Sequence, residues 1–273
     1  MRLKEDYSIS TFAMIHHPLK SAIDHLIHQG WRQIEIMCED GHRALLEWSD
    51  GQLAELKELG VRHGVTWTLH APIYSVNPVA ADSGKRLSSK DVLHRAMDIA
   101  EYLNCKYVVL HAGMEVGPTD GDGALSRCAS FLTDVLSERE RSSSLVLALE
   151  NVPPKDKLHG VSVTFVRTVV ERVGDPRMRI LFDAGHAHVL GPDACLKGLQ
   201  QCLPYLVSMH LNDNRGDYDS HLAIGMGTIP YPRLIQMVHS YGYQGSWVLE
   251  TETTAYADIS VQRLTEWHDR LMT

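Results

Sequence analysis

The stretch Leu145-Val-Leu-Ala-Leu-Glu150 is a short apolar run that ends on a carboxylate. Its length and its aliphatic composition are typical of a buried β-strand. Runs of the same kind recur along the chain, and each ends on His, Asp or Glu: Thr66–His70, Tyr107–His111, Leu145–Glu150, Met178–Asp183, Tyr205–His210 and Gly245–Glu250. Two earlier runs, Tyr7–Met14 and Gln33–Cys38, bring the number of predicted strands to eight.

Helical patterns alternate with these strands. Their apolar residues recur at helical spacing, and Pro18 and Gly30 flank the first pattern as expected at a helix start and end. The predicted helices are Pro18–Gln29, Asp50–His63, Ser88–Leu103, Ala124–Glu140, Thr164–Val173, Ala194–Leu203, Tyr231–Tyr241 and Ile259–Leu271. Eight strand–helix units without an internal linker predict an α/β protein with one domain over residues 1–273, a single (β/α)8 TIM barrel. The alternative is a doubly wound open sheet.

The strand ends carry metal-binding side chains. In a barrel of parallel strands, the C-terminal ends meet at one mouth, so these side chains are expected to converge there. Three more donors lie just beyond strand ends, and the full set is His70, His111, Glu150, Asp183, His186, His210, Asp219, His221 and Glu250. Imidazole and carboxylate ligands without thiolate suit zinc or manganese. Because one ion takes four to six ligands, nine donors predict one to three divalent ions. A single His at a strand end is more often an ordinary hydrogen-bonded residue, so the prediction rests on the recurrence.

Composition sets further limits. The chain has 273 residues, 44% hydrophobic residues and a net charge of −8, which allows a full core and gives no general attraction to nucleic acid or to an anionic membrane. The five cysteines are scattered, without a Cys-x-x-Cys pair, as is typical of reduced thiols in the cytoplasm. No signal-peptide stretch and no apolar run of about 20 residues is visible. We therefore predict a cytoplasmic protein without membrane contact, either monomeric or homo-oligomeric.

The strand-end motifs resemble those of the xylose-isomerase-like TIM-barrel superfamily. The resemblance spans the second to the eighth strand and is carried by Leu69-His70-Ala71-Pro72, Leu110-His111-Ala112-Gly113, Ala148-Leu149-Glu150-Asn151, Phe182-Asp183-Ala184-Gly185-His186, His210-Leu211-Asn212-Asp213-Asn214, Asp219–Ile229 and Leu249-Glu250-Thr251. The superfamily contains sugar isomerases and epimerases, inosose dehydratases, and endonuclease IV-type apurinic/apyrimidinic endonucleases.

The resemblance implies two different uses of the donors. In ketose 3-epimerases, one divalent metal is held by residues that match Glu150, Asp183, His210 and Glu250, the two glutamates transfer a proton, and a His at the position of His186 contacts the substrate. In the endonucleases, residues that match all nine donors hold three zinc ions.

We favour a metal-dependent isomerase or epimerase of a sugar, a sugar phosphate or a related polyol. Removing a proton next to a carbonyl needs a carboxylate base and an electrophile, which Glu150, Glu250 and a metal ion would supply. A zinc-dependent phosphodiesterase or apurinic/apyrimidinic endonuclease is the alternative, and only there is nucleic acid a partner. It is disfavoured because no basic stripe is visible. A lyase and a non-catalytic metal-binding barrel stay open.

Three further residues are weaker candidates for substrate contact. They are Glu35 on the second strand, Lys155 in the loop after Glu150, and Arg215 in the loop after His210. Glu35 has an alternative interpretation as part of an ion pair at the bottom of the barrel. Four methionines, which core packing explains more simply, are candidates for an apolar side of the pocket: Met37, Met114, Met209 and Met226.

Overall fold

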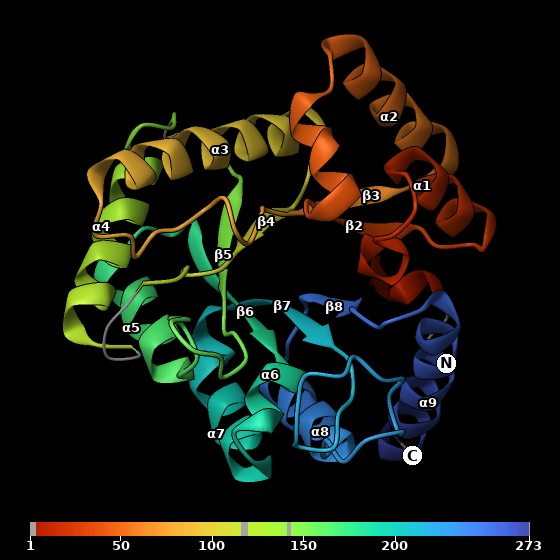
Figure 1. Ribbon diagram of the computed structural model, residues 1–273. Coiled ribbons are helices and arrows are strands. Elements are labelled where there is room, and N and C mark those ends of the chain that lie inside the picture. The colour runs from red at the N-terminus through yellow and green to blue at the C-terminus, as the bar shows by residue number, and fades with distance from the viewer. Residues whose placement is uncertain (1–3, 116–119, 141–142, 273) are drawn as a thin grey trace.

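Eight parallel strands close into a barrel. The computed structural model describes residues 4–115, 120–140 and 143–272. Within them the strands are β1 (Ser8–Ser10), β2 (Gln33–Met37), β3 (Thr66–His70), β4 (Tyr107–Leu110), β5 (Val146–Glu150), β6 (Met178–Asp183), β7 (Leu206–Leu211) and β8 (Ser246–Leu249). Each pairs with the next in the sequence, and β1 also pairs with β8 (Figure 1). The predicted (β/α)8 barrel is confirmed, and the open sheet is excluded. The single domain over residues 1–273 includes residues outside these ranges and stays a prediction.

Helices surround the barrel on its outside (Figure 1). The α-helices are α1 (Leu19–His28), α2 (Asp50–His63), α3 (Ser83–Tyr102), α4 (Asp122–Ser137), α5 (Val163–Val173), α6 (Ala184–Val189), α7 (Pro192–Cys202), α8 (Tyr231–Tyr241) and α9 (Thr254–Met272). Short 3-10 helices cover η1 (Lys4–Asp6), η2 (Thr11–Met14), η3 (Asp40–Glu47) and η4 (Leu203–Tyr205). None of the described helices is both long and apolar enough to cross a membrane.

Local capping explains where several helices begin. Ser49 and Gln52 form a reciprocal capping box at the start of α2, which begins where the sequence predicts. The side chain of Asp82 accepts a hydrogen bond from the backbone N–H of Lys85, at 2.8 Å, so α3 begins at Ser83 and not at the predicted Ser88. The predicted helical pattern had missed this polar first turn.

One predicted strand is wrong in its second half. Of Tyr7–Met14, only Ser8–Ser10 is strand, and the remainder forms η2. The hydroxyl of Ser10 accepts a hydrogen bond from the backbone N–H of Phe12, at 3.2 Å, and so caps the 3-10 turn. The turn brings the side chain of Phe12 toward the C-terminal mouth of the barrel, where it packs against His221 with ring centroids 4.6 Å apart.

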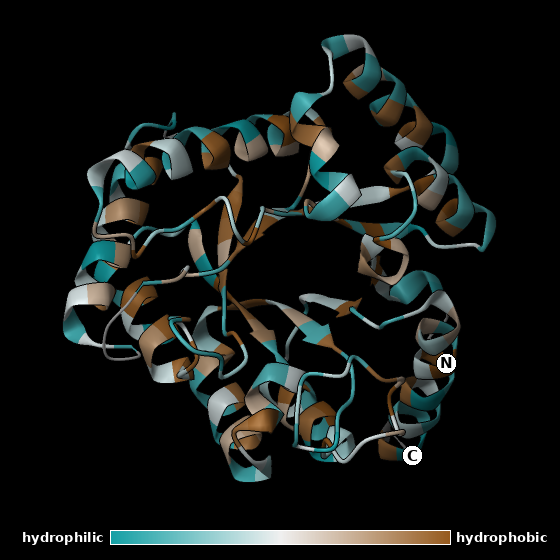
Figure 2. Ribbon diagram, viewed as in Figure 1, coloured by the Kyte–Doolittle hydropathy of each residue, from teal (hydrophilic) through white to brown (hydrophobic). Residues whose placement is uncertain are grey.

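Alternate side chains on the strands belong to the main apolar core, and those between them on β4 to β7 form a second apolar cluster. Residues such as Ile34, Ile36 and Leu69 are fully buried and belong to the main core with the surrounding helices, and brown apolar positions recur on strands and helices in Figure 2. Tyr107 and Leu181 belong to a second, smaller cluster of buried apolar residues. Fully burying one such aliphatic or aromatic side chain contributes about 1.5–3 kcal/mol. The alternation therefore leaves the last inward position of each strand free to carry a functional group.

Candidate metal centre

The nine predicted donors form three groups at the mouth of the barrel, and each group can bring its ligand atoms within 4.8 Å of one another. The strand group is Glu150, Asp183, His210 and Glu250, which lie at or next to strand ends. The histidine group is His70, His111 and Glu150. The loop group is His186, Asp219 and His221. Glu150 belongs to two of the groups and joins them.

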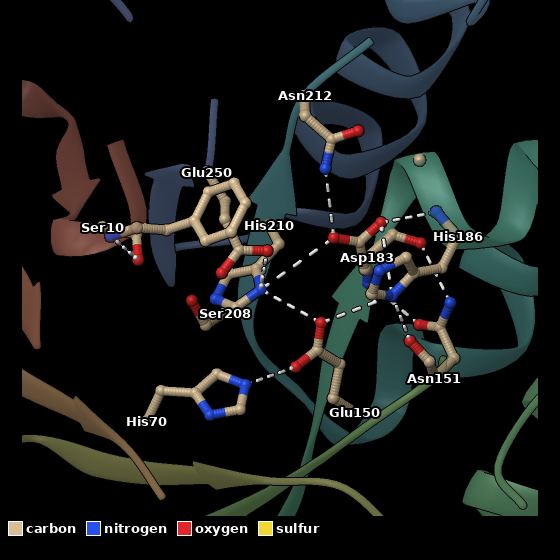
Figure 3. Close-up of polar contacts among 12 residues, drawn as sticks. Ser10, His70, Glu150, Asn151, Asp183, His186, Ser208, His210, Asn212 and Glu250 are labelled. Carbon is tan, nitrogen blue, oxygen red and sulfur yellow. Dashed lines mark hydrogen bonds and ion pairs between the residues drawn. The ribbon is translucent and has the colours of Figure 1, made fainter. Parts of the chain in front are cut away.

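The strand group is centred on one imidazole nitrogen. Nδ1 of His210 lies 3.0 Å from Oε1 of Glu150, 3.4 Å from Oε2 of Glu250 and 3.9 Å from Oδ2 of Asp183. All four residues are buried. Figure 3 shows the carboxylates of Glu150 and Asp183 directed at this nitrogen. The two glutamates that the sequence proposes as acid and base therefore share one small space, although they come from β5 and β8.

The histidine group uses the other oxygen of Glu150. Oε2 of Glu150 lies 3.1 Å from Nε2 of His70 and 3.2 Å from Nε2 of His111. Nδ1 of His70 hydrogen-bonds to the backbone oxygen of Ala71, at 2.8 Å, which directs Nε2 toward the carboxylate. One oxygen of Glu150 thus faces each of its two groups, as expected of a bridging carboxylate.

The loop group is more open. Oδ2 of Asp219 lies 3.2 Å from Nε2 of His186 and 3.1 Å from Nε2 of His221. The other ring nitrogens are fixed by backbone oxygens, because Nδ1 of His186 lies 2.8 Å from the oxygen of Asn151 and Nδ1 of His221 lies 2.7 Å from that of Glu250. Both Nε2 atoms are therefore directed at the same carboxylate.

Neighbouring residues orient the donors. Asn151 exchanges two hydrogen bonds with the backbone of Asp183, at 2.9 and 3.0 Å, and the amide of Asn212 donates to Oδ2 of Asp183, at 3.3 Å (Figure 3). Oδ1 of Asp183 also accepts from the backbone N–H of His186, at 2.6 Å, and so caps α6. The same carboxylate therefore fixes the helix that carries His186.

Glu35 on β2 is fully buried beneath the donors. Its Oε1 lies 2.9 Å from Nε2 of His210, and the opposite ring nitrogen faces the strand group. Hydrogen bonding of Nε2 to this carboxylate fixes the ring orientation of His210 and leaves Nδ1 as its ligand atom. The side chain is not among those that line the cavity at the mouth. Glu35 thus forms an ion pair, as the alternative interpretation expects, but with a donor near the strand ends and not at the bottom of the barrel.

Carboxylates in these groups favour the protonated form of the neighbouring imidazoles. Burial disfavours protonated His210, but the carboxylates of Glu250 and Glu35 outweigh it and raise the pKa of His210 well above its usual value. Burial likewise opposes protonation of His221, yet Asp219 raises the pKa of His221 to about 9. Burial raises the pKa of Asp183 to about 7. Protonated imidazoles thus offset the carboxylate charge, a role that a bound cation would take over.

The residues fit a divalent metal centre. Oε1 of Glu250 and Oδ1 of Asp219 are buried and have no hydrogen-bond partner among the described residues. Unsatisfied buried polar atoms are costly, and a metal ion or its water ligands would satisfy them. The donors are imidazole nitrogens and carboxylate oxygens, which suit zinc and manganese. The structure thus offers a suitable donor set, and the predicted role of each residue as a ligand stays a prediction.

A cavity of about 420 Å³ lies over the donors. Its described lining residues are Phe12, Met37, His70, Ile73, Tyr74, His111, Met114, Glu150, Pro153, Lys155, Asp156, Leu158, His186, Asp219, His221 and Glu250. Two predicted substrate contacts, His186 and Lys155, are among them. Arg215 is exposed on the loop after β7 and does not line this cavity. The volume lies in the range typical of small-molecule sites.

The sequence did not single out several lining residues, which are Phe12, Ile73, Pro153, Asp156 and Leu158, and it underrated two others. Phe12 lies in a segment predicted as strand, and the serine before the aromatic residue was the only signal of a turn. Met37 and Met114 line the cavity, whereas Met209 is buried in the core and Met226 is exposed. The inward position of Met37 follows from alternation with Glu35 on β2.

Known proteins share this fold. Residues 23–269 match the family described as xylose isomerase-like TIM barrel. The chain belongs to this family. Among curated relatives, an uncharacterised protein of Methanocaldococcus jannaschii is 25% identical over 96% of this chain and 88% of its own length. The residues that match the family include every donor described above.

Several relatives carry functional names, of two kinds. A probable endonuclease 4 of Mycoplasmopsis synoviae is 27% identical over 72% of this chain and 74% of its own length. The fructoselysine 3-epimerase of Escherichia coli O157:H7 is 23% identical over 86% of both chains. Family members with names of both functional classes predicted from the sequence are therefore similar to this chain.

Solved structures confirm the fold. A D-tagatose 3-epimerase-like protein superposes with a TM-score of 0.86 at 24% identity and covers 97% of both chains. The IolI protein with a bound zinc atom has a TM-score of 0.79 at 18% identity and covers 96% of both chains. At these identities the likeness shows the fold, and the chemistry has to be argued from the site.

Proposed function

We propose that this protein is a divalent-metal-dependent isomerase or epimerase of a sugar, a sugar phosphate or a related polyol. One observation carries the proposal: the carboxylates of Glu150 and Glu250 both lie close to Nδ1 of His210, at 3.0 and 3.4 Å, and both residues line the cavity. Two carboxylates that face one small space can remove a proton from one side of a carbon and return it from the other.

The strand group would hold the principal ion, which is zinc or manganese. A bound divalent ion supplies an electrophile for a substrate carbonyl and its neighbouring oxygen. The histidine and loop groups offer donors for further ions, so the centre takes one to three. The fully buried position of the strand group keeps bulk water away from the donors, which strengthens electrostatic interactions there.

Glu150 and Glu250 would act as proton-transfer groups. Burial alone would raise the pKa of each carboxyl, but His210 outweighs it, so the pKa of Glu250 is lowered and that of Glu150 is lowered strongly. Both groups are therefore charged at neutral pH and suited to act first as a base. Oε1 of Glu250 has no hydrogen-bond partner among the described residues and is available to a substrate proton. His186 lines the cavity beside them and would contact the substrate.

The names of similar proteins support this class. A fructoselysine 3-epimerase is similar in sequence, and a D-tagatose 3-epimerase-like protein is similar in fold. An epimerase of this type fits a cavity of about 420 Å³, which is too small for more than a short segment of any polymer.

A zinc-dependent phosphodiesterase or apurinic/apyrimidinic endonuclease is the second candidate. It is favoured by one observation, the gathering of all nine donors into three groups, because clustered ions suit the transition state of phosphodiester cleavage. Probable endonuclease 4 relatives point the same way. Against it, Lys155 is the single cationic side chain among the described residues that line the cavity, apart from histidines. DNA binding rests on several phosphate contacts by Lys and Arg.

Exchange of solvent deuterium tests the proposal. The metal-loaded protein is incubated in deuterium oxide with a panel of ketoses and ketose derivatives, and label at the carbon next to the carbonyl is measured by NMR. We expect label with at least one compound, and loss of label by about 10²–10⁴-fold in Glu150→Gln and Glu250→Gln. Glu252→Gln is the matched control, because Glu252 is exposed and outside the cavity. Undiminished exchange in both site variants would remove the acid–base pair.

An abasic-site duplex tests the second candidate on the same preparation. The proposed epimerase leaves the duplex intact at neutral pH in the presence of zinc. Efficient cleavage that disappears in Asp219→Asn would replace the sugar proposal with the nuclease.

A further inference from the structure

The cavity is lined by two chemically different sets of side chains. The donors come from the ends of β3 to β8 and the loops that follow them. The second set is apolar and comes from the strand ends or loops after β1 to β5: Phe12, Met37, Ile73, Met114, Pro153 and Leu158. We call this surface the apolar wall. Among the described lining residues, only Tyr74, Lys155 and Asp156 add polar groups beyond the donors, and all three are exposed.

The apolar wall is held firmly by hydrogen bonds. The amide of Asn77 donates to the backbone oxygen of Met114, at 2.7 Å, and its Oδ1 accepts from the backbone N–H of Met114, at 3.1 Å. This close approach requires Gly113, since a Cβ there would lie 2.2 Å from Oδ1 of Asn77. Met114 also forms a bridge with Leu158, and the two pack with Val152. Three loops are thus tied together behind the wall.

Two residues of the wall, Phe12 and Met37, lie next to metal donors. The ring of Phe12 packs against His221 with centroids 4.6 Å apart and planes at 41°. Met37 is the last residue of β2 and lies in register with His70 on β3. Apolar side chains of the wall are therefore direct neighbours of the metal donors.

The wall fits poorly to a bare sugar chain. A free ketose carries a hydroxyl on each carbon other than the carbonyl carbon, and each hydroxyl taken from water needs a partner. The donors would meet the oxygens at one end, whereas the described apolar wall offers no side-chain partner for the rest. An alkyl, acyl or aryl group placed there would instead gain from leaving water.

We propose that the substrate is a sugar derivative whose oxygen-bearing end faces the metal donors while an apolar substituent covers the wall. The inference rests on the proposed function for the identity of the oxygen-bearing end. The substituent binds to Phe12, Met37, Met114 and Leu158, and these residues select against free ketoses.

Binding of two matched hydroxamates to the zinc-loaded protein tests this specificity without turnover. Hexanohydroxamate and gluconohydroxamate share a metal-chelating head and a six-carbon chain, but only the second bears hydroxyls along it. We expect hexanohydroxamate to bind at least about tenfold more tightly by calorimetry, as burial of several methylene groups predicts. Equal binding, or tighter binding of gluconohydroxamate, overturns the proposed substrate class and leaves the metal centre standing. Failure of both probes to bind overturns the proposed substrate class and shows that the zinc has no coordination position open to the cavity, which contradicts the proposed function as well.

Substitutions in the wall test whether its residues cause the tighter binding of hexanohydroxamate. Met37→Gln and Met114→Gln keep the side-chain length and introduce an amide, so the ratio of the two dissociation constants should fall toward one while zinc content stays that of the wild type. Met226→Gln is the matched control, because Met226 is 44% exposed and lies outside the cavity. A ratio unchanged in both wall variants contradicts the assignment.

Discussion

The strand group and the loop group use the same ligand types but are built differently. In the strand group, Glu150, Asp183 and His210 end or nearly end strands of a closed barrel, and all of the side chains are buried. In the loop group, Asp219 and His221 lie on the long loop between β7 and α8, and both are partly exposed. A site on strands is held by ladder hydrogen bonds on both sides, whereas a loop site depends on local contacts.

The difference assigns the two groups different roles. The strand group should bind its ion more tightly, because its donors are already in place and screened from water. The loop group should bind a more exchangeable ion, or act through His186 as a substrate contact. The sugar proposal needs the first group, whereas the phosphodiesterase alternative needs both. Variants that affect one group and spare the other therefore separate the two functions.

The largest effect is expected from Glu150→Gln. Because Glu150 belongs to both the strand and histidine groups, loss of its charge weakens two groups at once. We expect metal content to fall clearly below that of the wild type and turnover to fall about 10²–10⁴-fold. Metal analysis and the deuterium exchange rate measure the two effects. Wild-type metal content in this variant would show that the carboxylate does not join the groups.

Asp219→Asn comes next, because it acts first on the loop group. Asp219 lies between His186 and His221, and its printed ion pairs are with these two histidines. We expect loss of the more exchangeable ion, while sugar turnover stays within about tenfold, a barrier change of about 1.4 kcal/mol. Loss of turnover as complete as that of Glu150→Gln would contradict the division of roles and favour a multi-ion mechanism.

The same contrast explains what the sequence could predict. Side chains alternate along a strand, and all strands of a barrel end at one mouth. The sequence pattern alone therefore predicts where Glu150 and His210 lie. The positions of Asp219 and His221 could be predicted only from a sequence motif, because loop residues follow no periodic pattern. The turn at Phe12 and the early start of α3 depend on single polar caps, Ser10 and Asp82, which apolar patterns do not show. The contact between Glu35 and His210 joins two strands that are far apart in the sequence, so it could be seen only in the three-dimensional structure.

A third variant breaks the support beneath the strand group. Glu35→Met removes the carboxylate that orients His210, so its ring nitrogen would no longer be fixed toward Glu150. Loss of such an outer partner typically weakens metal binding about 10–100-fold. Competition with a chelator of known affinity measures the change. Glu35→Gln keeps an acceptor for the ring N–H and should lie between the variant and the wild type. Equal affinity in all three proteins would make Glu35 a purely structural residue.

The last prediction concerns the wild-type protein and the dependence of its metal affinity on pH. Carboxylates hold the pKa of His210 well above its usual value and that of His221 at about 9, so both imidazoles carry protons at neutral pH when no metal is bound. Ligands must be deprotonated, so metal binding releases protons and the affinity rises with pH. Each released proton weakens binding about tenfold per unit of decrease in pH. Calorimetry in buffers of different ionisation enthalpy counts these protons, and a count of zero would contradict the assigned partners.

Elemental analysis of the purified protein, combined with anomalous diffraction at the zinc and manganese edges, tests the central claim most directly. The account predicts at least one ion per chain, with its anomalous peak among Glu150, Asp183, His210 and Glu250. Any further ions should lie at the histidine or loop group. A protein that holds no divalent ion after purification and after exposure to zinc or manganese, with these donors bonded only to one another, would contradict the account.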